Sequence, residues 1–220
     1  MSLSRSARLP ARVAGGDEGV VSRLVQVLLD AGIDGLGPLR SAREVADLAR
    51  RDTRTAEGAL KKVVRSHVVK GGVGGFVTGV GGFVTMPVAL PANVVEFYVG
   101  ATRMVGAIAT LRGYDVDDPQ VRTAVLLTLV GSDADEVLGK VGLSGTGGKV
   151  LGLVGEQLPP AALLMVNKAI AFRLLRGVGE KAFARLGRGI PLAGGVVGGG
   201  IDVWMMKRIA DHALSEFPQR

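Results

Sequence analysis

The chain has 220 residues, enough for one domain with a substantial core, and no Cys, which excludes disulfides, thiolate metal sites and cysteine nucleophiles. Hydrophobic residues make up 47% of it, aromatic residues only 4%, and glycine accounts for 34 positions. The net charge of +7 admits nucleic acid or anionic lipid as a partner. Because aromatic residues for base stacking are scarce and no recognition motif is present, nucleic-acid binding is the weaker of these two readings.

The N-terminus is basic and lacks the apolar run of a secretory signal peptide. It carries Arg5, Arg8 and Arg12. We therefore expect residues 1–16 to form a mobile basic tail. Residues 17–217 are predicted to form a single helical domain.

Three helices are predicted before residue 70. The first follows a possible Asp17 cap, carries apolar residues at helical spacing and ends at Gly32. The second begins with a capping box formed by Ser41 and Glu44. The third is predicted over residues 55–69, with one apolar side.

A tandem repeat follows, in which Val-Gly-Gly-Phe-Val-Thr occurs at residues 73–78 and again at residues 80–85. The offset of seven residues would present almost the same helical face twice. Gly71, Gly75 and Gly79 form a stripe of small residues that permits close helix packing. Its valines leave a strand as an alternative, and its length leaves a re-entrant hairpin or a membrane span open.

Further helices are predicted after the breaks at Pro87 and Pro91. They are expected over residues 92–112, from Asp118-Pro119 through residue 130, and over residues 132–141, 159–175 and 179–186. A last helix is expected after a second Gly-rich block. No convincing run of alternating strands appears. The sequence thus predicts an all-α fold.

The second Gly-rich block repeats the four-residue spacing of the first, at Gly194 and Gly198. We interpret the two blocks as halves of one packing device. The predicted architecture is a compact multi-helix bundle with two Gly-rich helical segments packed against each other at its centre.

Four basic residues precede the uncharged repeat: Lys61, Lys62, Arg65 and Lys70. A basic segment beside an apolar one is typical of the cytoplasmic side of a membrane. We interpret these residues as a candidate membrane-surface site. The alternative is an ordinary solvated helix face, since acidic residues are interleaved with the basic ones nearby.

A polar site is the second candidate, made by Asn93, Glu96, Arg103 and Asp202. Glu96 and Arg103 lie seven residues apart on one face of an apolar helix, where a buried unpaired charge would be costly. They could line a groove for a lipid head group or a small polar ligand. They could equally belong to a structural network that includes Arg122 or Asn167.

No motif for catalysis, metal binding or a cofactor is convincing. His67 and His212 lack a ligand partner at helical spacing, so both are predicted to be solvated or capping residues. The segment from Gly142 to Val150 departs from both the nucleophile elbow and the phosphate-binding loop, and we predict a loop there. We therefore assign no catalytic residue, no metal and no cofactor.

Several motifs follow one another in a distinctive order: a Gly-rich segment, a Pro-x-x-x-Pro break, a helix ending in Gly-Tyr-Asp, an Asp-Pro helix start and a late Gly-rich block with an Asp. In this order the chain resembles the EcsC family of bacterial proteins. The matching stretches are residues 74–82, 87–91, 112–115, 118–122, 167–172 and 191–202. The resemblance implies a helical protein in a bacterial membrane context.

The sequence therefore predicts a non-enzymatic protein at the cytoplasmic face of the cell membrane, peripheral or partly inserted. Its expected partner is an anionic membrane surface or a membrane protein, and a homo-oligomer is possible. The alternative is a hydrolase with a polar cleft around Glu96, Arg103 and Asp202.

Overall fold

The computed structural model describes residues 14–80, 92–140, 158–186 and 191–220, and within these ranges it contains helices and no strand. The predicted all-α fold class is confirmed. The elements in chain order are α1 (Ala14–Val27), the π-helix η1 (Leu28–Asp34), α2 (Ala42–Arg51), α3 (Ala56–Val80), α4 (Ala92–Leu111), α5 (Pro119–Thr128), the 3₁₀ helix η2 (Gly131–Asp133), α6 (Ala134–Lys140), α8 (Pro160–Leu186) and α9 (Pro191–Glu216).

Two helix starts are confirmed in detail. At α2, the Ser41 hydroxyl accepts a hydrogen bond from the Glu44 amide at 3.1 Å, and the Glu44 carboxylate accepts one from the Ser41 amide at 2.8 Å. At α5, the Asp118 carboxylate accepts from the Gln120 amide at 2.8 Å, and Pro119 takes the first helical position. Both arrangements satisfy amides that have no partner within the helix.

The first helix differs from its predicted limits at both ends. Because α1 begins at Ala14, Asp17 lies within the helix and not at its N-terminus, and residues 14–16 of the expected tail are helical. At the other end, the chain passes Gly32 as a π-helix and turns only at Gly35, whose φ is 81°. Gly35 has no Cβ, so it takes this left-handed backbone conformation without strain.

The Gly-rich segments interrupt helices less than their composition suggests. Helix α3 continues to Val80 through the first copy of the repeat, so the strand alternative is wrong there. Helix α9 is continuous from Pro191, and α8 joins two helices that were predicted separately. Glycine costs about 1 kcal/mol of helix propensity per residue, an amount that packing against a neighbouring helix can offset.

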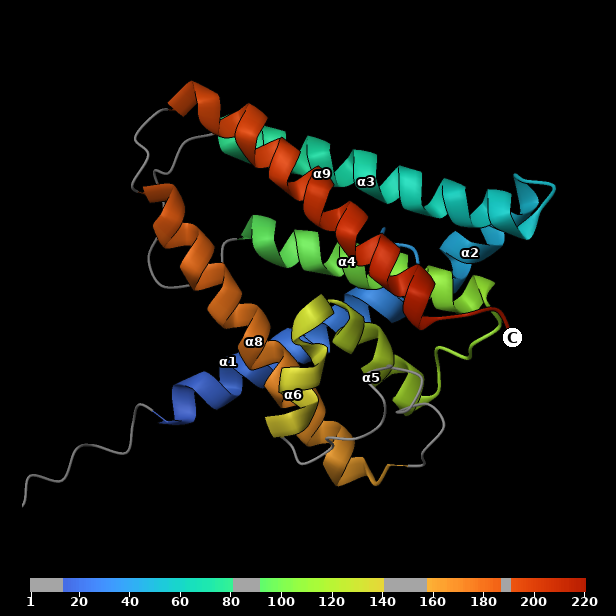
Figure 1. Cartoon of the computed structure of the whole chain (residues 1–220), viewed down its shortest axis with the longest axis horizontal. Coiled ribbons are helices and arrows are strands. Elements are labelled where there is room, and N and C mark those ends of the chain that lie inside the picture. Colours follow the sequence, from blue (N-terminus) through green and yellow to red (C-terminus); the bar gives the residue numbers. More distant parts are fainter. Residues whose placement is uncertain (1–13, 81–91, 141–157, 187–190) are drawn as a thin grey trace, which may run out of the picture.

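Helices α3 and α9 form one layer of the molecule. They run side by side in opposite directions and share the most extensive contact between any two elements (Figure 1). Their antiparallel course brings the Gly-rich end of α3 and the Gly-rich start of α9 to the same end of the pair. The predicted packing glycines are Gly71, Gly75, Gly79, Gly194 and Gly198. Their surroundings lie outside what the structure describes, so the contact between the two sets of glycines stays a prediction.

Among the described residues, the buried core centres on α4 and α5. Helix α4 contacts α2, α3, α5, α9 and η1, and α5 is buried along nearly its whole length. The α3–α9 layer covers one side of α4, whereas α5, α6 and α1 lie on the other side (Figure 1). The described core therefore lies beneath the layer that carries the Gly-rich segments.

Small residues let the helices approach α4 closely. A Cβ added to Gly106 of α4 would lie 2.9 Å from the Cβ of Ala42 on α2, which is closer than van der Waals contact allows. A Cβ added to Gly32 of η1 would lie 2.7 Å from the Cβ of Thr102. By contrast, a Cβ added to Gly100 of α4 would meet nothing within 4 Å.

We expect Gly106→Ala to lower the free energy of unfolding by about 1–3 kcal/mol, because overpacking at the α2–α4 contact forces the helices apart. Gly100→Ala in the same helix should leave stability unchanged or raise it by up to about 1 kcal/mol. Urea unfolding followed by far-UV circular dichroism measures both. Adding Ala42→Gly should recover part of the loss in Gly106→Ala; equal effects of the two alanines would contradict the close contact.

Candidate functional site

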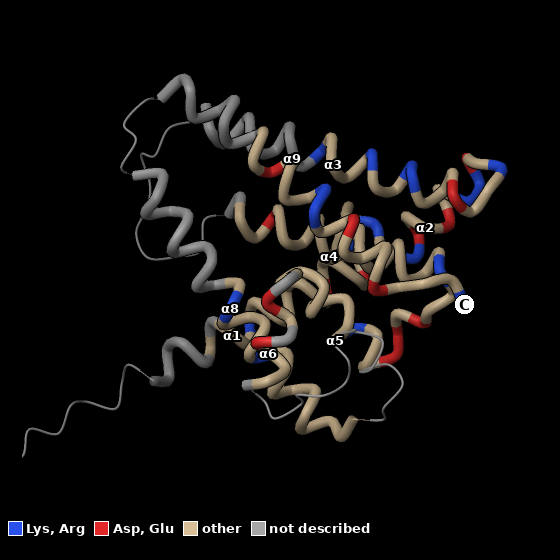
Figure 2. Tube along the Cα trace, in the orientation of Figure 1, with Lys and Arg blue, Asp and Glu red and all other residues tan. Residues whose placement is uncertain are grey.

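The predicted membrane-surface residues form one exposed face of α3. Lys61, Lys62, Arg65 and Lys70 are all exposed, and Figure 2 shows basic residues along this helix. With Ser66 and Val69 they line a shallow, open depression. We call these six residues the basic face. Since all of them come from a single helix, the depression does not have the walls of an enclosed active site.

The charges of the basic face are only partly neutralised. Lys61 pairs with Glu57 at 2.7 Å and Lys62 pairs with Asp52 at 2.6 Å, and all four side chains are well exposed. Within the described part of the chain, Arg65 and Lys70 have no carboxylate partner. Exposed ion pairs contribute about 0–1 kcal/mol, so the two paired lysines can exchange their partners at little cost. The basic face therefore keeps a net positive charge.

The predicted polar site does not join its two charges on α4. Glu96 is exposed, whereas Arg103 is half-buried and donates from Nη2 to the Ala31 carbonyl at 2.7 Å. Seven residues of helix separate their positions by about 10 Å along the axis. Asp202 lies half-buried on α9, and the side chain of Asn93 is outside the described residues.

Arg103 serves as a link between helices. Its bond to the middle of η1 lies in a partly buried setting, and this burial lowers the pKa of the guanidinium. Its Nε is buried without a hydrogen-bond partner. Arg122, suggested as a partner in the same network, pairs with Asp34 instead. Arg103 thus ties α4 to η1 through a backbone carbonyl.

His67 corrects a prediction, because it is buried where a solvated side chain was expected. Its Nδ1 lies 2.8 Å from the Val63 carbonyl. Burial is the largest cause that lowers the pKa of His67; the Val63 bond opposes the shift, and the charges of Lys70 and Arg103 add to it. His67 lies four residues after Val63, on the apolar side of the helix, and this spacing is the sequence signal from which its burial could have been predicted.

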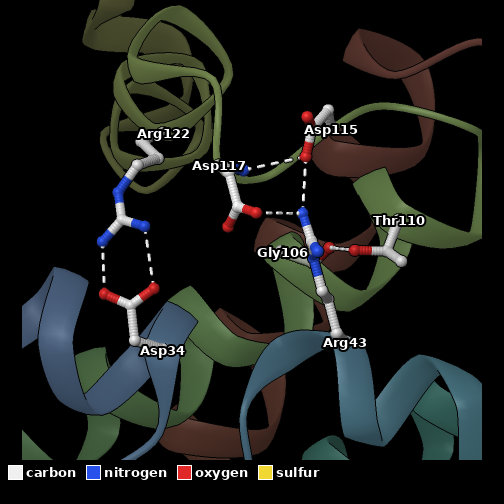
Figure 3. A network of polar contacts seen from close by, with 7 residues as sticks. All are labelled: Asp34, Arg43, Gly106, Thr110, Asp115, Asp117 and Arg122. Carbon is white, nitrogen blue, oxygen red and sulfur yellow. Dashed lines mark hydrogen bonds and ion pairs between the residues drawn. The ribbon is translucent and has the colours of Figure 1, made fainter.

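Sequence reasoning also missed a network of arginines and aspartates around the loop between α4 and α5 (Figure 3). Arg43 of α2 binds Asp115 at 2.5 Å and Asp117 at 2.6 Å. Arg122 of α5 makes two bonds to Asp34 of η1, at 2.8 and 2.5 Å. These partners are 72 to 88 residues apart in the sequence, so no local pattern indicated them.

The chemistry of this network is structural. Each guanidinium engages carboxylates from a different element, so the network holds α2 and η1 to the start of α5. In the described ranges, no group of three or more His, Asp or Glu residues is arranged to hold a metal ion. The loop at residues 142–150, which resembled phosphate and nucleophile motifs, lies outside the described residues.

One helical segment is long and apolar enough to cross a membrane, judged on the described residues: Val94–Leu111 of α4. Within the fold 61% of this segment is buried, and it is the central helix of the core. A core helix passes the same test of length and hydropathy, so the segment adds only weak support to insertion. The second half of the repeat and the proline break, residues 81–91, lie outside the described residues.

Neither a protein-family model, nor a curated protein, nor a solved structure matches the chain. The resemblance to the EcsC family therefore stays a prediction that rests on the order of the motifs.

We expect the stability of the protein to fall as the pH drops from about 7.5 to about 5.5. In the unfolded chain His67 titrates near its ordinary value of 6.5, but its pKa in the folded protein is lower. Below about pH 6.5 the unfolded chain therefore binds a proton that the folded protein resists, and the free energy of unfolding decreases. Urea unfolding at both pH values measures this loss.

His67→Gln should reduce this pH dependence, since glutamine does not titrate and can still donate to the Val63 carbonyl. His212→Gln on α9 is the matched control, because these are the only two histidines. The free energy of unfolding of both variants is measured at both pH values. A pH dependence that survives in His67→Gln would contradict the assignment.

Proposed function

We propose that this protein is a non-enzymatic, helical, membrane-associated protein that binds the cytoplasmic face of a bacterial cell membrane. The basic face of α3 would contact anionic lipid head groups, alone or beside a membrane protein. One observation carries the proposal: Arg65 and Lys70 are exposed on this face and have no carboxylate partner among the described residues. The motifs that resemble the EcsC family agree with this setting.

The energetics suit reversible binding. A Lys or Arg near an anionic membrane surface contributes about 1 kcal/mol, and this attraction falls off within a Debye length. Arg65 and Lys70 contribute directly, and Lys61 and Lys62 contribute once their exposed pairs rearrange. Several such residues on one helix give a binding free energy that is small enough for added salt to release the protein from the membrane.

The exposed side chain of Val69, which lies between Arg65 and Lys70 in the sequence, adds apolar surface to the face. Its exposed fraction is 56%, which is unusual for a valine in a helix that packs against α2, α4 and α9. Apolar area that is exposed among cations can enter the boundary between head groups and acyl chains. The basic face thus combines the two properties that peripheral membrane binding uses.

Among the residues that the structure describes, nothing supports the hydrolase alternative. A hydrolase that uses carboxylates needs two of them, or a nucleophile and a base, within reach of one pocket. Glu96 is exposed, Arg103 is engaged with the Ala31 carbonyl, and the depression described above lies on α3. We therefore keep the non-enzymatic proposal.

We expect the purified protein to sediment with vesicles of phosphatidylglycerol and phosphatidylcholine at low ionic strength. Arg65→Gln/Lys70→Gln should weaken the binding about 30-fold, because two contributions of about 1 kcal/mol are lost. Raising the salt to about 0.5 M should weaken binding of the wild type. Co-sedimentation at a series of lipid concentrations measures the affinities.

Arg23→Gln/Arg40→Gln is the matched control, since it removes two exposed charges from α1 and from the loop before α2. It should bind nearly as tightly as the wild type. Equal weakening by both double variants would show that net charge alone drives the binding. A wild-type protein that stays in the supernatant at low salt would refute the proposal.

A further inference from the structure

Helix α9 exposes the only tryptophan of the chain. Trp204 has an exposed fraction of 59%, and its neighbour Val203 has one of 36%. Tryptophan usually buries most of its large apolar surface in a core or an interface. A single exposed apolar residue requires no explanation, so the significance of Trp204 depends on its surroundings.

The surroundings of Trp204 are cationic. The guanidinium of Arg208, one turn further along α9, lies 5.3 Å from the centroid of the indole ring. Lys207 is exposed beside it. The pair with Arg208 holds the indole along the helix, on the side that faces solvent. Asp211 lies on the same side one turn later, so this surface carries two cations and one carboxylate.

The position of Trp204 on α9 turns it away from the core. The buried residues Met206, Ile209, Ala210 and Ala213 define the inward side of the helix. At 100° per residue, Trp204 and Arg208 fall opposite to them. On α3, Arg65 and Lys61 likewise fall opposite to the buried Val63 and Ala59.

These two surfaces belong to the same layer of the molecule. Helices α3 and α9 pack side by side on α4 (Figure 1), so both outward sides face away from α4. The surface around Trp204 therefore lies on the helix beside the basic face. The two surfaces supply different groups: α3 mainly supplies cations, and α9 supplies a large amphipathic aromatic ring next to cations.

An anionic bilayer is the partner that fits this combination. Tryptophan is enriched at membrane interfaces, where its ring meets the acyl boundary and its N–H stays near water. Cations beside it complement phosphate groups. Among the described side chains, the basic residues beside the exposed apolar Leu164, Met165 and Phe172 of α8 are Lys168 and Arg173, both partly buried, and Arg173 is paired with Asp133. These apolar residues indicate no particular partner.

We infer that Trp204, held by Arg208, is an interfacial anchor that inserts its indole among the head groups of an anionic bilayer when the α3–α9 layer docks on it. This inference rests on the proposed function and adds the residue that penetrates the lipid. Arg65 and Lys70 bring the protein to the surface, and Trp204 then buries apolar area there. Binding at high salt depends on Trp204 more than on the basic face.

The single tryptophan makes the wild-type protein its own probe. On addition of vesicles of phosphatidylglycerol and phosphatidylcholine, the fluorescence of Trp204 should shift to shorter wavelength. Lipids brominated near the top of the acyl chain should quench it more than lipids brominated near the chain end. Trp204→Ala should reduce vesicle affinity about tenfold, because a large side chain no longer buries its apolar surface. Trp204→Phe should keep part of the affinity.

Phe172→Ala on α8 is the matched control, since Phe172 also has an exposed fraction of 59%. It should bind vesicles like the wild type. The comparison then shows whether the loss of affinity in Trp204→Ala comes from the position of Trp204 or from the removal of any exposed aromatic side chain. Circular dichroism of each variant verifies that the helices are intact.

The outcomes distinguish this inference from the function on which it rests. Vesicle binding with an unshifted emission and unchanged affinity of Trp204→Ala would overturn the anchor and leave the proposed function standing. The anchor would also be overturned if the emission shifted only on addition of a membrane protein fraction. A wild-type protein that does not bind anionic vesicles at low salt would overturn the proposed function itself.

Discussion

The fold depends on the close approach of several elements to one central helix. Helix α4 is contacted by α2, α3, α5, α9 and η1, and small residues let two of these elements come very close. Gly106 of α4 lies against Ala42 of α2, and Gly32 of η1 lies against Thr102 of α4. Larger buried residues of α4, such as Tyr98, Met104 and Ile108, fill the remaining core around these close contacts.

Close packing leaves little room for polar groups, and the chain accommodates them in two ways. Two of the buried threonines bond to their own helix: the hydroxyls of Thr102 and Thr128 donate to carbonyls four residues earlier, at 2.7 and 2.8 Å. Arginines are placed at the edges of the core, where they reach a carbonyl or a carboxylate of another element. Arg103 and Arg122 both bind η1, so the π-helical segment is held from α4 and α5 together.

The local features of the fold could be predicted from the sequence, and the long-range ones could not. The capping box at Ser41 and the Asp118–Pro119 start are short-range hydrogen-bond patterns, so they can be recognised in the chain itself. The continuity of α3 through its glycines depends on pairing with α9, which lies more than 100 residues away. The pairing of Arg122 with Asp34 has the same origin. The burial of His67 is an intermediate case. Its spacing from Val63 is visible in the sequence, but its basic neighbours suggest that the side chain is exposed to solvent.

The candidate site shows the same division. The exposed positions of Lys61 and Arg65 follow from helical periodicity, which places them opposite the buried Ala59 and Val63 of α3. Lys70 lies seven residues after Val63, so its exposure depends on how the neighbouring helices pack. The expected polar groove required side chains from separate helices to converge, and the structure uses Arg103 for packing instead. The neighbours of Trp204 in the sequence, Val203, Met205 and Met206, are all apolar, so the local sequence does not indicate that Trp204 lies on the outer side of the last helix. Its exposure becomes evident only when the inward side of α9 is defined by contact with α3, α4 and α5. The buried Met206, Ile209 and Ala213 turn one side of α9 toward these helices, and helical periodicity then leaves Trp204 on the opposite side, exposed to solvent.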